Sequence, residues 1–590
     1  MADLSRRDLL RSGAVVGGAA ALGGLAPAAV SAHGNGGKGG KGRGGRLLLT
    51  DGKIHTMDDR GRVVRDVLIE DGKFVDVGNH IGRGRDTDVI DLRGKTVVPG
   101  LIESHTHFVS VANRPGYHVA QLELASTIAE VLELLADRRA STDIPDGAFI
   151  TAMGGGVHPN LWAERRLPTL TELDEAVPDR PVLVFQRGNG PSVVNTLGKQ
   201  FFETVTSPLA GPVAVAADGT IASGLPSTTA LYHLRVRQTF EDKKRSARDA
   251  MAFSAQVGIT ALLDQTLVAV GNGGPRDPQP THGLPTLDHY RMYDGWIAAH
   301  HDGDALVRLQ INFLHNEGFR ADLGPIGELE KQLPELRQRL KNQFQFFGDD
   351  MLRTGAIGEW AAPFALQATN PNGYAVWFEA QRLVAQAQWR NENAQGNPTQ
   401  IQQVVETYEA MDAEFGIKHL RWGLQHGDNA TPEQLARLKA LDVGLSTSGF
   451  RWQGGPSPTG APVGPLFPQL VASGINLGMH EDGVHIAPHN PWFALHYATT
   501  GLGWLGDQIN PGQQISRQQA LHLYTRGNAW YLNRENELGS IERGKFADLL
   551  VLDRDYFRVS DESMRRTQPV LTVVGGEVVH DTGRLRGRGR

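Results

Sequence analysis

Short apolar runs separated by Asp-Gly and Arg-Gly turns follow residue 46 and return near the other end of the chain. This alternation predicts short β-strands at residues 47–49, 63–69, 74–77, 89–92 and 96–98. The later group covers residues 546–552, 570–574 and 577–579. We therefore expect both chain ends to build one small β-sandwich domain from residues 47–98 and 538–580.

Between these ends, strand-like runs alternate with amphipathic helical patterns. The strand candidates are residues 100–103, 259–264, 307–313, 354–358, 388–393, 419–425, 443–446 and 475–479. Helical spacing is found at residues 240–256, 326–341, 400–415, 432–441 and 464–472. Eight strands with intervening helices predict an α/β protein with a (β/α)8 TIM-type barrel at residues 99–537. Residues 108–250 or so would form an insertion after its first strand.

The first 46 residues have the composition of an export segment and a tether. Arg6 and Arg7 precede a Gly/Ala-rich apolar stretch and a small-residue cleavage site at residues 30–32. Residues 1–32 thus resemble a twin-arginine signal peptide, which implies recognition by the Tat export machinery and a periplasmic or extracellular protein. A disordered basic N-terminus is the alternative. Residues 33–46 are a glycine-rich linker, and residues 581–590 form a basic tail.

Charge and composition argue against two classes of protein and restrict the residues that could bind a metal. The formal net charge is -6, of which the first 46 residues carry +5, so residues 47–590 carry -11. Such a body repels phosphate, which argues against a nucleic-acid partner. No apolar run after residue 32 is long enough to cross a bilayer, which argues against an integral membrane protein. The chain has no cysteine and 21 histidines, so any metal site must use histidine and carboxylate ligands.

His105 and His107 end the apolar run that starts at residue 96. Alternation along a strand puts residues two apart on one face, so both imidazoles can share a cation. The active sites of (β/α)8 barrels lie at the carboxyl ends of the strands, where this pair would stand. A metal or catalytic role is therefore favoured over a pair of hydrogen-bonded loop histidines.

Three segments give the chain a family resemblance. PGLIESHTH at 99–107, GSIERGKFADL at 539–549 and VGGEV at 574–578 together resemble the amidohydrolase superfamily. The similar branch is the YtcJ-like one, which includes N-substituted formamide deformylases. The resemblance runs from about residue 46 to residue 580. It implies a barrel with metal ligands on the first, fourth, fifth, sixth and eighth strands, beside a small β-sandwich.

The resemblance assigns ligands one by one. His105 and His107 match the first strand, and His426 matches the sixth, with a buried structural histidine as the alternative interpretation. Asp482 matches the aspartate of the eighth strand. Glu481 is its rival, because this loop is offset from the family pattern, and a solvated acidic turn is a third interpretation.

Two positions depart from the family pattern. Glu359 stands where many relatives carry a carboxylated lysine, and its carboxylate could bridge two cations in the same way. A helix cap or an arginine partner is the alternative role for Glu359. The fifth-strand histidine is missing, and Asn393 stands near the expected place. An amide oxygen is a poor zinc ligand. The protein would therefore bind only one ion, have a weak second metal site, or have lost catalysis.

These residues predict an exported, metal-dependent hydrolase that cleaves a C–N bond, of amide or N-formyl type, in a small molecule. The expected cofactor is a divalent metal, zinc by its ligands, as one or two ions. Asp482 would take the proton of a metal-activated water and return it to the leaving amine, and His426, if not a ligand, would steady the oxyanion. The alternatives are an ester or lactone hydrolase, an isomerase using the same ion, or an exported binding or regulatory protein on a decayed barrel.

Overall fold

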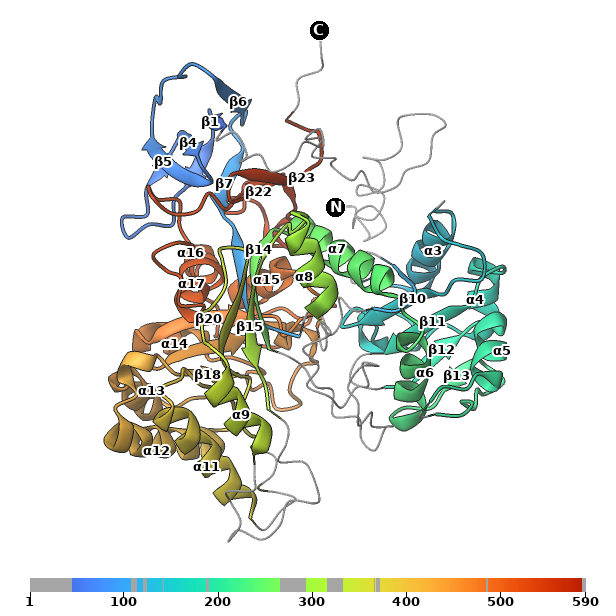
Figure 1. The fold of residues 1–590 in the computed structure, drawn as a ribbon. Coiled ribbons are helices and arrows are strands. Elements are labelled where there is room, and N and C mark those ends of the chain that lie inside the picture. The colour runs from blue at the N-terminus through green and yellow to red at the C-terminus, as the bar shows by residue number, and fades with distance from the viewer. Residues whose placement is uncertain are drawn as a thin grey trace.

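The structure is a computed structural model that describes residues 45–107, 114–119, 122, 125–141, 143–186, 190–208, 210–265, 293–315, 333–364, 367, 372–483 and 487–585. The predicted signal peptide, residues 33–44 of the predicted linker and residues 586–590 lie outside the described residues. Three groups of elements lie side by side in Figure 1: mixed sheets of the chain ends, parallel strands with covering helices, and a sheet-and-helix unit on the right. No helix among the described residues has the length and apolarity needed to cross a membrane.

The two chain ends build two sheets that share one buried core. The first sheet has the order β5-β4-β1-β6, with β1 (Arg46–Thr50), β4 (Asp66–Glu70), β5 (Lys73–Gly78) and β6 (Thr87–Asp91). The second has the order β23-β22-β21-β7-β2-β3, with β2 (Lys53–His55), β3 (Val63–Val64), β7 (Thr96–Pro99), β21 (Leu549–Leu552), β22 (Pro569–Val574) and β23 (Glu577–Asp581). Leu49 and Phe74 of the first sheet and Val97 and Leu549 of the second belong to one buried apolar cluster.

One strand expected from the sequence is divided between these sheets. The run at 63–69 forms β3, which pairs with β2, and β4, which pairs with β1 and β5. Arg65 lies between them, and its N–H donates to Gly78 O at 3.2 Å, so the chain leaves one sheet for the other there. The prediction of a single strand was wrong because an unbroken apolar run does not show which sheet each residue joins.

Two four-stranded parallel sheets form the middle of the chain. One has the order β16-β15-β14-β8, with β8 (Leu101–Thr106), β14 (Ile259–Gln265), β15 (Arg308–Phe313) and β16 (Leu352–Ile357). The other has the order β17-β18-β19-β20, with β17 (Glu392–Ala394), β18 (Gly423–Gln425), β19 (Gly444–Ser448) and β20 (Asn476–His480). Parallel bridges from Ile357 to Asn391 and from Thr106 to Gly483 join the two sheets at both edges. Each strand overlaps one that the sequence predicts.

Helices connect these strands. Those that overlap the predicted amphipathic stretches are α7 (Phe240–Val257), α9 (Pro334–Asn342), α12 (Pro398–Phe415), α13 (Pro432–Ala440) and α14 (Phe467–Ser473). The others are α8 (Asp294–His301), α11 (Gly373–Gln386), α15 (Pro491–Thr500), α16 (Arg517–His522), α17 (Asn528–Tyr531) and α18 (Asp561–Met564). Thr239 caps α7, and Gly258 ends it with a φ of 93° that favours glycine. The predicted strand at 419–425 is shorter, because Lys418–Leu420 form a 3-10 turn ahead of β18.

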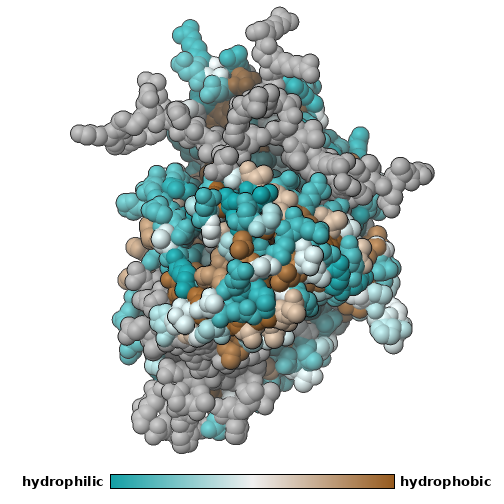
Figure 2. Space-filling view, turned by 90° about the vertical axis from the view of Figure 1, so that its right-hand side faces the viewer, coloured by the Kyte–Doolittle hydropathy of each residue, from teal (hydrophilic) through white to brown (hydrophobic). Residues whose placement is uncertain are grey.

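A separate sheet occupies the segment after β8. Its order is β13-β12-β11-β10-β9, with β9 (Tyr117–His118), β10 (Ile150–Gly154), β11 (Val182–Gln186), β12 (Ser192–Val194) and β13 (Thr220–Ile221). The accompanying helices are α3 (Ile128–Arg139), α4 (Leu170–Ala176), α5 (Thr196–Thr204) and α6 (Leu225–Arg235). Figure 2 views the molecule from this side, where hydrophilic residues are interspersed with hydrophobic ones. A glycine is required at position 155, where this unit packs against the loop after β20, because a Cβ there would lie 1.9 Å from the main chain of Ala487.

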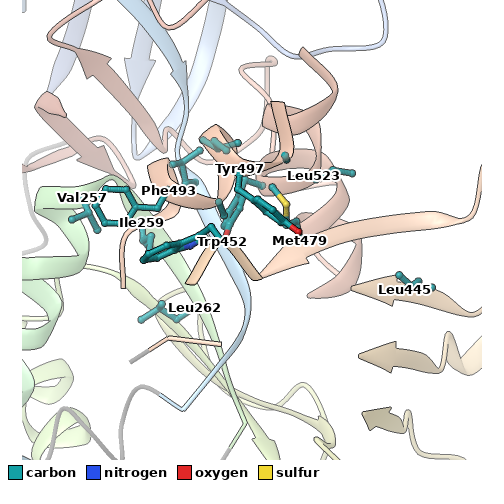
Figure 3. Packing of buried hydrophobic residues seen from close by; sticks show 14 of the residues in the cluster. Val257, Ile259, Leu262, Leu445, Trp452, Met479, Phe493, Tyr497 and Leu523 are labelled. Carbon is teal, nitrogen blue, oxygen red and sulfur yellow. The ribbon is translucent and has the colours of Figure 1, made fainter. Parts of the chain in front are cut away.

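One large apolar cluster connects the parallel strands with their helices. Figure 3 shows part of it, with Leu262 of β14, Leu445 of β19 and Met479 of β20. The ring centroids of Trp452 and Phe493 lie 5.3 Å apart at a T-shaped angle. Each fully buried aliphatic or phenyl side chain contributes about 1.5–3 kcal/mol, so this cluster holds the strand ends in fixed positions.

Candidate metal centre

Five predicted site residues meet at the carboxyl ends of four parallel strands. His105 lies in β8 and His107 follows it, Glu359 follows β16, His426 follows β18, and Asp482 follows β20. Parallel strands end at the same edge, so residues that are far apart in sequence come together there. The side chains of His105 and His107 are at most 4% exposed, those of Glu359 and Asp482 at most 9%, and that of His426 14%.

The donor atoms of these residues face one another. His105 Nε2 lies 3.5 Å from Asp482 Oδ1 and 3.9 Å from Glu359 Oε1. His107 Nε2 lies 3.3 Å from Asp482 Oδ1 and 3.5 Å from Glu359 Oε2, and His426 Nε2 lies 3.6 Å from an oxygen of each carboxylate. Donors about 2.0–2.2 Å from a shared tetrahedral ion are about 3.3–3.6 Å apart. The spacing therefore fits ligands around a cation better than hydrogen bonds, which are shorter.

Neighbouring groups orient two of the imidazoles. His107 Nδ1 donates to the carbonyl oxygen of Gln265 at 2.7 Å, which directs Nε2 at the carboxylates and leaves Nε2 as the nitrogen that can bind a metal. His426 Nδ1 lies 2.9 Å from Ser448 Oγ. Within the described part of the chain, both ring nitrogens of His105 and Asp482 Oδ1 are buried without a hydrogen-bond partner. Buried polar atoms are normally satisfied, so these orphan atoms fit ligands for a metal ion.

Electrostatics favour positive charge between the carboxylates. Burial alone would lower the pKa of His107, but the nearby carboxylates of Asp482 and Glu359 raise that pKa to about 9. Glu359 likewise raises the pKa of His426 against the effect of burial. Burial would raise the pKa of the Asp482 carboxyl, yet His105 and His107 hold it well below its usual range. Both carboxylates therefore keep their charge and attract a cation.

The structure separates Asp482 from its rival Glu481. Glu481 Oε1 accepts the backbone N–H of Ala494 at 3.0 Å, and Glu481 Oε2 lies 3.4 Å from Trp452 Nε1. Glu481 thus contacts α15 and the turn after β19, while Asp482 lies beside the imidazoles.

The expected placement of Asn393 was wrong. Its amide donates to Gln381 Oε1 of α11 at 2.8 Å and to the hydroxyl of Tyr408 in α12 at 2.9 Å, so it faces the surrounding helices. The neighbouring Glu392 instead accepts from Gln265 and Gln425, at 2.7 and 2.8 Å. Strand alternation was the available signal, but the short strand β17 did not fix its register in the sequence.

Two further residues at the centre have no role in the sequence-based interpretation. His480 ends β20, and its ring centroid lies 4.6 Å from that of His105 and 4.7 Å from that of His426. Glu103, two residues before His105, accepts the backbone N–H groups of His105 at 3.2 Å and of Glu481 at 3.1 Å. Period-two spacing from predicted site residues was the signal for both: His480 precedes Asp482 as Glu103 precedes His105.

Comparisons with known proteins agree with this architecture. The sequence profile described as "Amidohydrolase family" matches residues 88–580. The chain is 25% identical over 561 residues to the N-substituted formamide deformylase of Arthrobacter pascens, covering 90% of this chain and 97% of that protein. It is 23% identical over 571 residues to the putative amidohydrolase YtcJ of Bacillus subtilis, covering 90% and 98%. An uncharacterized metal-dependent hydrolase from Pyrococcus horikoshii is similar in fold, with a TM-score of 0.55, 16% identity and coverage of 88% and 99%.

Proposed function

The chain belongs to the amidohydrolase family, and from this membership we propose that it hydrolyses a carbon–nitrogen bond, of amide or N-formyl type, in a small molecule. The membership confirms the resemblance of residues 99–107 and 539–549 to that family. The observation that carries the proposal is the convergence of three Nε2 atoms on two buried carboxylates. The name of the Arthrobacter relative supports the N-formyl class.

The proposal includes a closed (β/α)8 barrel at residues 99–537 and a composite β-sandwich at residues 47–98 and 538–580. The parallel bridges at both edges of the two four-stranded sheets support closure. The buried cluster shared by the two mixed sheets of the chain ends supports the sandwich. In such a barrel, chemistry takes place where the strands end, and the five site residues lie there.

A divalent ion fits the donor set, and zinc is the proposed ion because imidazole and carboxylate are its usual ligands when thiolate is absent. His105, His107 and Asp482 form one group of donor atoms within 4.8 Å of one another, and Glu359 and His426 complete the centre. When bound, the ion would polarise a carbonyl and lower the pKa of its water to about 7.

The chain's own residues would then move protons and stabilise charge. Asp482 stays ionised because the imidazoles hold its pKa low, so its carboxylate accepts the proton of the attacking water and delivers it to the leaving amine. His426, fixed by Ser448, lies opposite Asp482 and steadies the developing oxyanion wherever it is not itself a ligand. Export through the twin-arginine signal at residues 1–32, to the periplasm or the outside, is part of the same proposal.

Metal analysis combined with a substrate panel tests this function. The mature protein, residues 33–590, is expressed with excess zinc and assayed on N-substituted formamides, simple amides, esters and lactones. We expect at least one ion per chain and release of amine from a formamide or amide, lost in Asp482→Asn. The matched control is His233→Asn, because His233 is a buried histidine of α6 that bonds to Ser207 and Gly211, outside the centre.

Other outcomes decide between the rivals. Turnover of esters or lactones alone would assign an ester or lactone hydrolase, and conversion without hydrolysis would assign an isomerase. The missing fifth-strand histidine favours a decayed binding protein as the second candidate. Less than about 0.2 equivalents of metal, with no effect of His105→Ala, would establish that candidate and refute the hydrolase.

A further inference from the structure

His480 has the surroundings of a metal ligand. It is the last residue of β20, and its imidazole is fully buried. Within the described residues, neither of its ring nitrogens has a hydrogen-bond partner. A buried structural histidine normally bonds through at least one nitrogen, as His233 does, because an unpaired polar atom loses its hydration without compensation. Packing explains the burial of His480 but leaves both nitrogens unsatisfied.

The rings around His480 have the spacing of imidazoles on an ion. The centroids of His105, His426 and His480 lie 4.6 to 4.9 Å from one another. A ring bound through nitrogen has its centroid about 3.2 Å from the metal, so neighbouring rings in a tetrahedral or octahedral centre have centroids about 4.5–5.2 Å apart. One nitrogen of each of these three rings lies within 4.8 Å of the others.

The carboxylate of Glu359 faces imidazoles on two sides, an arrangement that suits two cation positions. Glu359 presents its two oxygens to different imidazoles: Oε2 lies 3.5 Å from His107 Nε2, and Oε1 lies 3.6 Å from His426 Nε2. A carboxylate with this arrangement can span two ions. Two groups of donors share His105: His107 and Asp482 complete one group, and His426 and His480 complete the other.

We propose that His480 ligates a second cation position with His426 and replaces the ligand that β17 does not provide. This inference rests on the proposed function, because it assumes that His105, His107 and Asp482 hold a metal. In the family pattern this ligand comes from the fifth strand, whereas here it would come from β20. The shift is geometrically feasible because β20 brings His480 and Asp482 to the same strand end.

Metal titration of His480→Asn tests the inference. After dialysis against a weak chelator, we expect two ions in the wild-type protein and one in the variant, or at least a 10-fold loss of affinity in the second binding step. His233→Asn should bind as the wild type does. Equal stoichiometry and affinity in wild type and His480→Asn would overturn the inference while leaving the proposed function standing. A wild-type protein that binds no ion would refute both.

A second variant gives a spectroscopic readout that does not depend on activity or on the fate of His480→Asn. The chain contains no cysteine, so His480→Cys introduces its single thiol. With Co²⁺ bound, we expect a thiolate-to-cobalt charge-transfer band in the near ultraviolet, because the thiolate is itself a metal ligand. Cobalt binding without that band would place residue 480 outside the coordination sphere and overturn the inference.

Discussion

Raising the pH from 7 to 9 is expected to tighten zinc binding about 50-fold, through His107. In the metal-free protein, Asp482 and Glu359 raise the pKa of this buried imidazole to about 9. Because the pKa is raised, His107 keeps its proton below pH 9 and releases it above, and only the neutral ring binds zinc. Each pH unit below 9 costs about 1.36 kcal/mol, so displacement of this one proton at pH 7 costs about 2.7 kcal/mol.

The assay is competition with a chelator of known affinity at half-unit steps from about pH 6.5 to 9.5, with calorimetry in buffers of different ionisation enthalpy to count released protons. The slope should be at least one proton per ion below pH 9, since the raised pKa of His426 adds to it. His107→Asn should reduce the slope by one proton, whereas His233→Asn should keep it. Equal zinc affinity at pH 7 and pH 9 would show that no protonated imidazole is displaced. The assignment of a raised pKa to His107 in the metal-free protein would then be wrong.

Three further predictions concern the fold, the chemistry and the export. Asp548→Asn should destabilise the protein by about 3–5 kcal/mol, because it removes the carboxylate that pairs with the buried guanidinium of Arg308. Arg308 Nε and Nη2 lie 2.8 and 2.9 Å from the two oxygens of Asp548. An unchanged midpoint of urea unfolding would contradict this prediction. Asp482→Asn should lower kcat/KM for a formamide or amide substrate about 10²–10⁴-fold without a change in the circular dichroism spectrum, and full activity would remove Asp482 from the mechanism. Replacing Arg6 and Arg7 by lysine should retain the precursor in the cytoplasm on immunoblots of cell fractions, whereas normal export would remove the twin-arginine assignment.

Much of the architecture could be predicted from local pattern. Most of the parallel strands overlap predicted apolar runs, because a strand buried on both faces has few polar residues; β17, with the sequence Glu-Asn-Ala, is an exception. His105 and His107 were identifiable because two polar residues at the end of such a run have no packing role there. His426 and Asp482 needed the family resemblance as well, since a single histidine or aspartate after a strand can equally belong to a turn or a helix cap.

The remaining features depend on contacts that no local pattern contains. The run at 63–69 passes between two sheets: its first residues pair with Ile54 and His55 of β2, and its later residues pair with β1 and β5. The direction of Asn393 follows from the register of β17 against β18, and with three residues that strand is too short to show its alternation. The role of His480 depends on two imidazoles that lie 54 and 375 residues away in the sequence.

The buried acids behind the centre explain how its ligands keep their places. Glu103 bonds to the backbone N–H groups of both His105 and Glu481, so one carboxyl group fixes the strand ends that carry His105 and Asp482. Burial raises the pKa values of Glu103 and Glu481 well above their usual range, and their proximity adds to this for Glu481. Burial therefore favours the neutral form of both acids, so they compete less than Asp482 for a cation. The same strand ends thus carry the acids of the candidate centre and the buried acids that position its candidate ligands.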